Sequence, residues 1–145
     1  MAKFRTLLTT IALLSGVVSQ AEHWVYEAGG GSSLKELVVK AVAGDTITVH
    51  GTVSEGTITI DKPLTLLGQH GALIDGGAEG DVLLITADDV TVRGFTIRNP
   101  MHSNLNDMAG IKVQACRRAV ITENRLEQCF FAIYLNGAQD TRVER

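Results

Sequence analysis

The apolar residues of this chain follow one helical pattern near its start and a series of short alternating patterns afterwards. Residues 33–36, Ser-Leu-Lys-Glu, have the order of a capping box, in which the serine and glutamate side chains satisfy exposed amides of the first helical turn. The apolar residues that follow at one-sided helical spacing are Leu34, Leu37, Val38, Ala41 and Val42. Gly44 ends this pattern. The sequence therefore predicts one amphipathic helix over 34–42, whose apolar face must lie against another part of the protein.

After Gly44, short β-branched and apolar runs recur at close intervals and are separated by Gly, Asp and Asn. Most of these runs alternate apolar with polar residues, which is typical of strands with one buried face. The expected strands are 46–49, 57–60, 64–66, 82–85, 90–92, 95–97, 111–113, 120–122 and 133–135. No helical pattern lies between them, which argues against βαβ units.

The strand pattern is repeated. Val92 and Ile97 return 29 residues later as Ile121 and Leu126, and Val143 follows Ile121 after a further 22 residues. Two inward columns are expected, one of Ile58, Val82, Ile111 and Ile133, the other of Ile60, Leu84, Val113 and Leu135. A period of 22 to 24 residues with one 29-residue repeat is the length of one β-helix coil. The predicted fold is all-β, a right-handed single-stranded parallel β-helix (solenoid) with an N-terminal capping α-helix.

Tight corners between the strands need residues that tolerate a positive φ or bond their own backbone. The expected corner residues are Gly68, Asp75, Gly76, Gly77, Gly94, Asn99, Asn124, Asn136 and Gly137. The helix over 34–42 is expected to cover the first coil, because an open solenoid end exposes unpaired backbone groups. At the other end the sequence stops at Arg145, two residues after an inward valine. We therefore expect residues 45–145 to be the first coils of a truncated β-helix.

The first 21 residues have the pattern of a signal peptide. Lys3 and Arg5 precede a short apolar run, and Ser19 and Ala21 place small residues where a signal peptidase cleaves. We expect an exported, periplasmic protein that starts at Glu22, with an N-terminal segment over 22–44 whose first residues, His23 and Trp24, are poorly ordered. The mature chain has eleven basic and sixteen acidic residues and no basic patch, so nucleic acid is not an expected partner. It also contains no second apolar run long enough to span a membrane.

The longest repeat has a surplus of residues around 100–108, which predicts a projecting loop. This loop carries Met101, His102 and Met108, whose thioether and imidazole groups suit copper, particularly Cu(I). Alternatively, the methionines hold the loop on the solenoid and His102 is solvated, or the loop contacts a partner. Cys116 and Cys129 have no metal-binding spacing; a disulfide is possible in an oxidising compartment, but two separate structural cysteines are the favoured interpretation.

Four carboxylates lie near successive corners, at Asp75, Asp81, Asp88 and Asp89. In β-helix lyases such groups hold Ca²⁺, and in β-helix hydrolases paired carboxylates act as acid and base. Here they are interpreted first as turn and corner residues, and Arg93 and Arg98 as outward charges. No catalytic residue and no cofactor-binding residue is assigned, and a non-enzymatic role is favoured.

Three segments together resemble one family. They are GALIDGGAEG at 71–80, ADDVTVRGFTIRN at 87–99 and NLNDMAGI at 104–111. In residue type and spacing they are similar to the N-terminal part of NosD-type proteins, periplasmic maturation factors of nitrous oxide reductase. The entry into the first strand at 44–47, Gly-Asp-Thr-Ile, is shared with a wider set of carbohydrate-binding and sugar-hydrolysing β-helices.

The resemblance implies a periplasmic accessory factor in denitrification that assists assembly of the copper site of nitrous oxide reductase. It implies an ABC-type ATPase–permease pair, a copper-carrying lipoprotein and nitrous oxide reductase as partners. Two other functions stay open, namely a carbohydrate-active β-helix (a polysaccharide lyase or glycoside hydrolase) and a sugar-binding solenoid.

Overall fold

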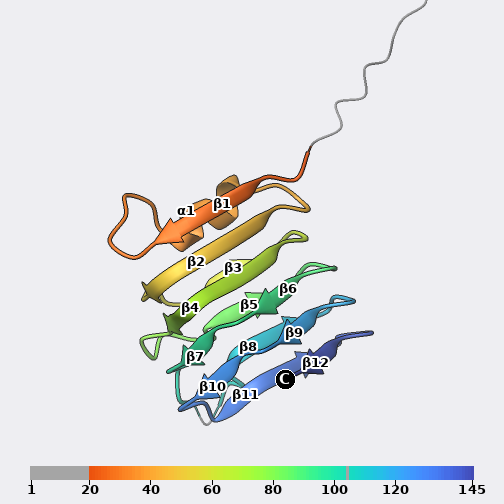
Figure 1. Ribbon diagram of the computed structural model, residues 1–145. Coiled ribbons are helices and arrows are strands. Elements are labelled where there is room, and N and C mark those ends of the chain that lie inside the picture. Colours follow the sequence, from red (N-terminus) through yellow and green to blue (C-terminus); the bar gives the residue numbers. More distant parts are fainter. Residues whose placement is uncertain (1–19, 104) are drawn as a thin grey trace, which may run out of the picture.

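The described strands form two parallel stacks that wind into a solenoid of about five turns. The computed structural model describes residues 20–103 and 105–145. Successive rungs are stacked from β1 to β12 in chain order (Figure 1). Every pairing between described strands is parallel, which is the pattern predicted for stacked coils. The predicted parallel β-helix is therefore confirmed.

One stack contains eight strands and the other contains four. The first has the order β1-β2-β4-β6-β9-β12, with β7 pairing with β4 and β10 with β7. Its members are β1 (His23–Glu27), β2 (Thr46–Val53), β4 (Thr65–Asp75), β6 (Thr91–Arg93), β7 (Thr96–Arg98), β9 (Val120–Thr122), β10 (Arg125–Glu127) and β12 (Arg142–Glu144). The second stack has the order β11-β8-β5-β3. It contains β3 (Ile58–Ile60), β5 (Leu83–Ile85), β8 (Ala109–Gln114) and β11 (Phe131–Asn136).

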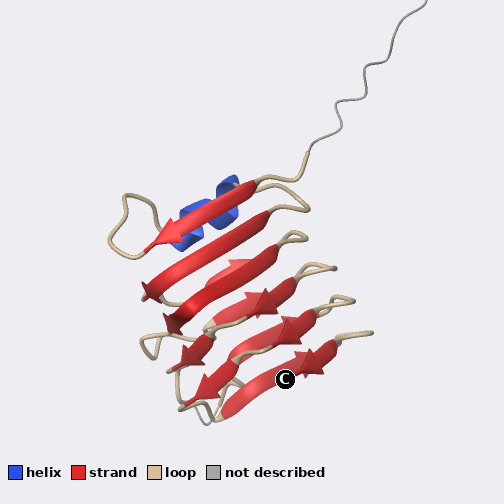
Figure 2. Cartoon of the chain, viewed as in Figure 1, coloured by secondary structure: helices blue, strands red, loops and turns tan. Residues whose placement is uncertain are grey.

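Helix α1 (Leu34–Lys40) packs at the β1 end of the strand ladder (Figure 2). Both hydrogen bonds of the predicted capping box are present between Ser33 and Glu36. Its apolar residues Leu34, Leu37 and Val38 are buried in the same core as the inward strand residues. The helix is shorter than predicted, because Ala41 leaves the helical conformation and Val42 is 47% exposed.

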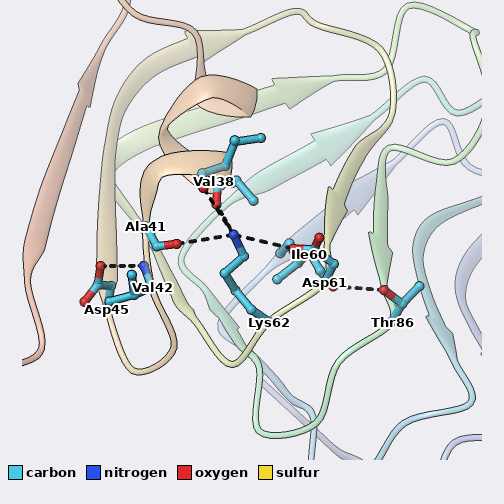
Figure 3. Close-up of polar contacts among 9 residues, drawn as sticks. Val38, Ala41, Val42, Asp45, Ile60, Asp61, Lys62 and Thr86 are labelled. Atoms are coloured by element: carbon cyan, nitrogen blue, oxygen red, sulfur yellow. Dashed lines mark hydrogen bonds and ion pairs between the residues drawn. The ribbon is translucent and has the colours of Figure 1, made fainter. Parts of the chain in front are cut away.

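Two side chains from the solenoid hold the ends of α1. Glu55 accepts hydrogen bonds from the amides of Leu34 and Lys35, at 2.7 and 3.0 Å, and places negative charge at the helix N-terminus. Lys62 donates from Nζ to the carbonyl oxygens at the other end, as Figure 3 shows for Val38 and Ala41. Each charge lies at the end of the helix where the helix dipole favours it.

The inward columns run through the interior without a polar interruption. One column follows the register Ile47, Leu66, Val92, Ile121 and Val143. The predicted equivalences of Val92 with Ile121, Ile97 with Leu126, and Ile121 with Val143 are all confirmed by strand register. An inward residue with a rung on either side is buried by stacking, and Val92 is completely buried.

The predicted columns were wrong by one residue in β5. Leu83, not Val82, pairs with Ile58 and Ile111, and Ile85 takes the position predicted for Leu84. Leu84 is half-buried and pairs with Lys112. Residues 82–85 are all apolar, so no polar residue fixes which of them face inward, and a shift of one residue exchanges the two faces.

Two further predictions were wrong. Residues 23–27 form β1, which pairs with β2 over its whole length, so His23 and Trp24 are not loose terminal residues. Gly68 is not a corner but lies inside β4. A Cβ at Gly68 would lie 2.5 Å from the carbonyl oxygen of Gly94 on the next rung, so glycine is required there by close backbone approach rather than by a turn.

The predicted signal peptide falls almost entirely on residues 1–19, which lie outside the described residues. Within residues 20–103 and 105–145, no helix is long and apolar enough to cross a membrane.

Candidate functional site

The predicted loop leaves the solenoid between β7 and β8. Its first anchor is the amide of Met101, which donates to the carbonyl oxygen of Gly80 at 2.7 Å. Its second is the amide of Ala109, which donates to Asp81 Oδ1 at 2.8 Å. Asp81 also forms an ion pair with Lys112 at 3.1 Å, and the side chains of both are largely buried. Both ends of the loop are thus fixed to the connection between β4 and β5.

The three residues predicted to bind metal occupy different environments. Met101 and Met108 are half-buried, whereas His102 is exposed. The His102 ring packs edge-to-face against Phe130, with ring centroids 5.7 Å apart. Among the described residues, His, Cys, Asp and Glu side chains form no group of three that could hold a metal ion. Copper binding by Met101, His102 and Met108 therefore stays a prediction.

An aromatic cluster lies against this loop. Phe130 contacts Phe131 edge-to-face, and Phe131 packs against Tyr134 with centroids 5.6 Å apart. The Tyr134 hydroxyl donates to Asp107 Oδ2 at 3.1 Å, and this bond raises the pKa of Tyr134. Lys112 Nζ lies 5.6 Å from the centre of the Tyr134 ring. We call His102, Asp107, Lys112, Phe130, Phe131 and Tyr134 the loop–aromatic surface.

Sequence reasoning missed the loop–aromatic surface. The sequence did contain a signal for it. The 22-residue repeat places Tyr134 next to Lys112, as the register of β11 with β8 shows. Phe130 is 69% exposed, and exposed aromatic side chains are enriched at sites of protein contact. The loop connects β7 to β8 but contacts residues of the following coil, so the surface is built from two successive coils.

The predicted corner residues fall into two groups. Gly94, Asn99 and Gly137 adopt positive φ angles of 82°, 56° and 65°. Asn124 does not; its side chain accepts from the Phe95 amide at 3.0 Å and donates to the Val92 carbonyl oxygen at 2.9 Å, and so joins two coils. A Cβ at Gly76 would lie 2.6 Å from the carbonyl oxygen of Asn99, so the two coils approach closely there too.

Asp75 joins its corner to the next coil. Its carboxylate accepts from the Gly77 amide at 3.0 Å, from Arg98 Nε at 2.9 Å and from the Asn99 side chain. The Gly77 amide is the main cause of a lowered Asp75 pKa, and Asn99 and Arg98 add to it. The structure thus places Asp75 as an ionised link between rungs.

The four predicted carboxylates are not brought together. Asp75 pairs with Arg98, Asp81 with Lys112, and both Asp88 and Asp89 with Arg118. Arg93 pairs with Glu123 through two hydrogen bonds of 2.9 Å. Each of the four carboxylates therefore pairs with a cation, Asp88 and Asp89 sharing Arg118, and the pairs follow the corners of successive coils.

The two cysteines are free thiols, and each has a different hydrogen-bond partner. Cys116 is buried and its thiol donates to the carbonyl oxygen of Ile85 at 3.8 Å. Cys129 is half-buried and its thiol donates to the carbonyl oxygen of Glu127 at 3.1 Å. Burial is the main cause of a raised pKa at both thiols, which makes them less reactive at neutral pH.

Fold and site together define a parallel β-solenoid with a helical cap and a projecting loop on one side. The chain is similar to two curated proteins named "Probable ABC transporter binding protein NosD". One, from Stutzerimonas stutzeri, is 35% identical over 91 residues, and the other, from Pseudomonas aeruginosa, is 40% identical over 96 residues. Each match covers 61% of this chain but only 21% and 22% of the relative, so the chain matches about a fifth of the length of these proteins.

The similarity and the solenoid fit a segment of a NosD-type protein, which confirms the resemblance found in the sequence. No family model matches the chain. No solved structure matches it either.

Proposed function

We propose that this solenoid belongs to an exported, periplasmic accessory factor that assists assembly of the copper site of nitrous oxide reductase. In this proposal it acts with an ABC-type ATPase–permease pair, and a copper-carrying lipoprotein supplies the metal. The observation that carries the proposal is the 35–40% identity to relatives named as ABC transporter binding proteins. A non-enzymatic role agrees with carboxylates that each pair with a cation.

The loop–aromatic surface is the part of the chain best suited to contact a partner. Parallel strands and paired corners hold it rigidly, which lowers the entropy lost on binding. Phe130 offers an exposed aromatic side chain, and aromatic residues contribute most of the binding energy at many interfaces. Tyr134 and Asp107, joined by a hydrogen bond of 3.1 Å, add exposed polar groups to the same surface.

The test is performed with the full-length protein in its natural host. A strain that lacks the protein should contain a reductase without its complete copper site, as measured by metal content and absorption spectrum. Affinity-tagged protein should also copurify with the ATPase–permease pair. An intact copper site in the deletion strain would refute the proposed function.

Two variants test whether the loop–aromatic surface makes the contact. Phe130→Ser should reduce copurification of the transporter at least tenfold, because it removes an exposed aromatic contact. Val39→Ser is the matched control, since Val39 is 76% exposed on α1 at the other end of the solenoid. Equal copurification by both variants would show that the partner binds elsewhere.

Copper itself would be cargo, and the loop offers the thioether and imidazole groups of Met101, His102 and Met108 as ligands. These groups suit Cu(I). Titration with Cu(I) against a competing chelator should show weaker binding for the double variant Met101→Leu and Met108→Leu than for wild type. Identical affinities would remove these residues from copper handling and leave the contact role of the loop intact.

A further inference from the structure

Asp45 is an unusual carboxylate in this chain because it is completely buried and accepts hydrogen bonds from three directions. Its Oδ1 atom accepts from the backbone nitrogen of Glu22 at 2.7 Å. Its Oδ2 atom accepts from the indole nitrogen of Trp24 at 2.8 Å and from the amide of Val42 at 2.9 Å, the last of which Figure 3 shows. Asp45 thus joins β1, and the segment that follows the C-terminus of α1, to the first turn of the solenoid.

This carboxylate has no cationic partner among the described residues. Asp75, Asp81 and Asp89 each form an ion pair with an arginine or a lysine. Across residues 20–103 and 105–145, Asp45 forms no ion pair, although its relative exposure is 0%. A buried carboxylate usually has a cationic partner. The three hydrogen bonds stabilise its charge but do not neutralise it.

The first of its donors is the residue that the sequence predicts as the start of the mature protein. The signal-peptide pattern ends at Ala21, so cleavage would release the nitrogen of Glu22. Gln20 and Ala21 are exposed, which leaves this bond accessible. The carbonyl oxygen of Glu22 accepts from the Thr46 amide at 3.0 Å, so the Glu22 backbone is held beside Asp45 on both sides of its Cα.

We propose that hydrolysis of the Ala21–Glu22 bond by a signal peptidase converts the Glu22 nitrogen into an ammonium group that forms an ion pair with Asp45. Water supplies a hydroxyl group to the Ala21 carbonyl carbon and a hydrogen to the Glu22 nitrogen, which then takes up one proton. Asp45 is therefore the binding site for the new N-terminus. This inference rests on the export that is part of the proposed function.

The consequence is a stronger attachment of β1 to the first coil after processing. The amide donates one hydrogen and carries no charge, whereas the ammonium has three hydrogens and a positive charge. Hydrogen bonds between charged groups are roughly twice as strong as neutral ones. Glu22 is exposed, so its new charge keeps part of its hydration while it pairs with the buried carboxylate.

The attachment should depend on pH in the mildly alkaline range. An α-amino group has an ordinary pKa of about 7.7–8.0, and the Asp45 carboxylate favours the charged form and so raises it. A raised pKa means that the ion pair stabilises the folded state fully below about pH 7.7 and is lost as the pH rises through the folded-state pKa.

Other titratable groups lie on the elements packed against Asp45. His23 on β1 hydrogen-bonds Thr48 at 2.7 Å. Lys62, after β3, donates to the carbonyl oxygen of Ala41 at 3.2 Å. Glu22 also has its own side-chain carboxylate. The variants His23→Gln and Glu22→Ala, each made in the processed protein, separate these groups from the α-ammonium.

The first experiment identifies the processing site in the full-length protein purified from its natural compartment. Mass spectrometry of its N-terminal peptide should show a chain that begins at Glu22. A mature protein that begins at any other residue, or that keeps the leader, would overturn the proposal without touching a role in reductase assembly.

The second experiment measures the ion pair directly in four forms of the full-length protein. Two begin at Glu22, produced by a site-specific protease that leaves no extra residue, and two keep Gln20 and Ala21; each pair has either Asp45 or Asp45→Asn. Hydrogen exchange of the β1 amides should be on the order of fivefold faster with the two-residue extension when Asp45 is present. In the Asp45→Asn background the extension should change exchange much less.

The pH dependence supplies an independent readout. The protection of β1 in the form with Glu22 and Asp45 should decrease between pH 7 and pH 10 by more than in the extended form, after correction for intrinsic exchange rates. The same decrease in both forms, or an extension effect that is equal with Asp45 and with Asp45→Asn, would overturn the inference. Reductase assembly is not measured here, so this result stands apart from the proposed function.

Discussion

The first and the last described coils contribute residues to the same inward column, but these residues differ in how far they are buried. Ile47, in the rung next to β1, is completely buried, whereas Val143 in β12 is 50% exposed. Both residues belong to one column in strand register. The first coil lies between its neighbouring strands and α1, while Val143 is covered only by the rung of β9. An inward position in a solenoid is therefore buried by its neighbours and not by its own coil.

The two ends also differ in how their backbone groups are held. At the first coil, Asp45, Glu55 and Lys62 satisfy amides and carbonyl groups of α1 and β1 with charged side chains. At the last described coil, Arg142 and Glu144 pair with each other within one strand. At the first coil, charged groups thus join separate elements, whereas the Arg142–Glu144 pair lies within β12.

The largest effect is expected from one substitution made at two positions of the same column. Val92→Ala should lower the free energy of unfolding by about 2 kcal/mol, because it removes buried methyl groups and leaves a cavity. In the same 22–145 chain, Val143→Ala should cost less than half of this. Urea unfolding followed by circular dichroism measures both. Equal losses would show that the last column position is as well covered as the central one.

A smaller effect is expected at the helix that closes the first coil. Lys62→Met keeps the aliphatic part of the side chain but removes the donor to the carbonyl oxygens of Val38, Val39 and Ala41, and should cost about 1 kcal/mol. Lys35→Met on the outer side of α1 is the control and should change stability by less than about 0.5 kcal/mol. Thermal unfolding measures both variants, and similar losses would contradict the role of Lys62.

The smallest effect is a pH dependence confined to the first coil. The hydrogen bond from the Glu22 amide is the main cause of a lowered Asp45 pKa, followed by those from Val42 and Trp24. A lowered pKa means that Asp45 stabilises the folded state above its unfolded pKa of about 3.9 and that this contribution is lost as the pH falls through the folded-state value.

Trp24 is the only tryptophan of the chain, so its fluorescence reports the first coil. Between pH 6 and pH 2 the fluorescence should change before the circular dichroism of the strands does. Asp45→Asn should remove that early change, and a variant of Asp75 should keep it. A single transition seen by both probes in wild type would mean that the first coil does not respond separately.

Repetition made most of the fold predictable, and its failures have local causes. The equivalence of Val92 with Ile121 was clear because each is followed five residues later by another apolar residue, Ile97 or Leu126. Around β5, the four consecutive apolar residues 82–85 did not show which of them face inward, and the prediction chose Val82 where Leu83 faces inward. Strand β1 was missed because a single strand at the beginning of a chain has no repeat before it to mark its register.

The candidate site was predictable only in part for a similar reason. The loop around 100–108 followed from the length of its repeat, but its contact with Phe130 depends on how the next coil folds beneath it. The backbone conformations of the corners were likewise predictable only in part. Ala115 and Arg118 adopt positive φ angles of 51° and 56°, which their residue types do not favour. Their amides donate to carbonyl oxygens of the next coil, a bond that exists only after stacking.

By itself the sequence determined the coil period, the capping helix and the resemblance to NosD-type proteins, because apolar spacing and capping residues act over short distances. Tertiary structure decided which of the apolar residues in β5 face inward, how the loop–aromatic surface is assembled, and that Asp45 lies beside the nitrogen of Glu22. These features join residues from different coils, and the energy of such contacts depends on register, which no single repeat contains.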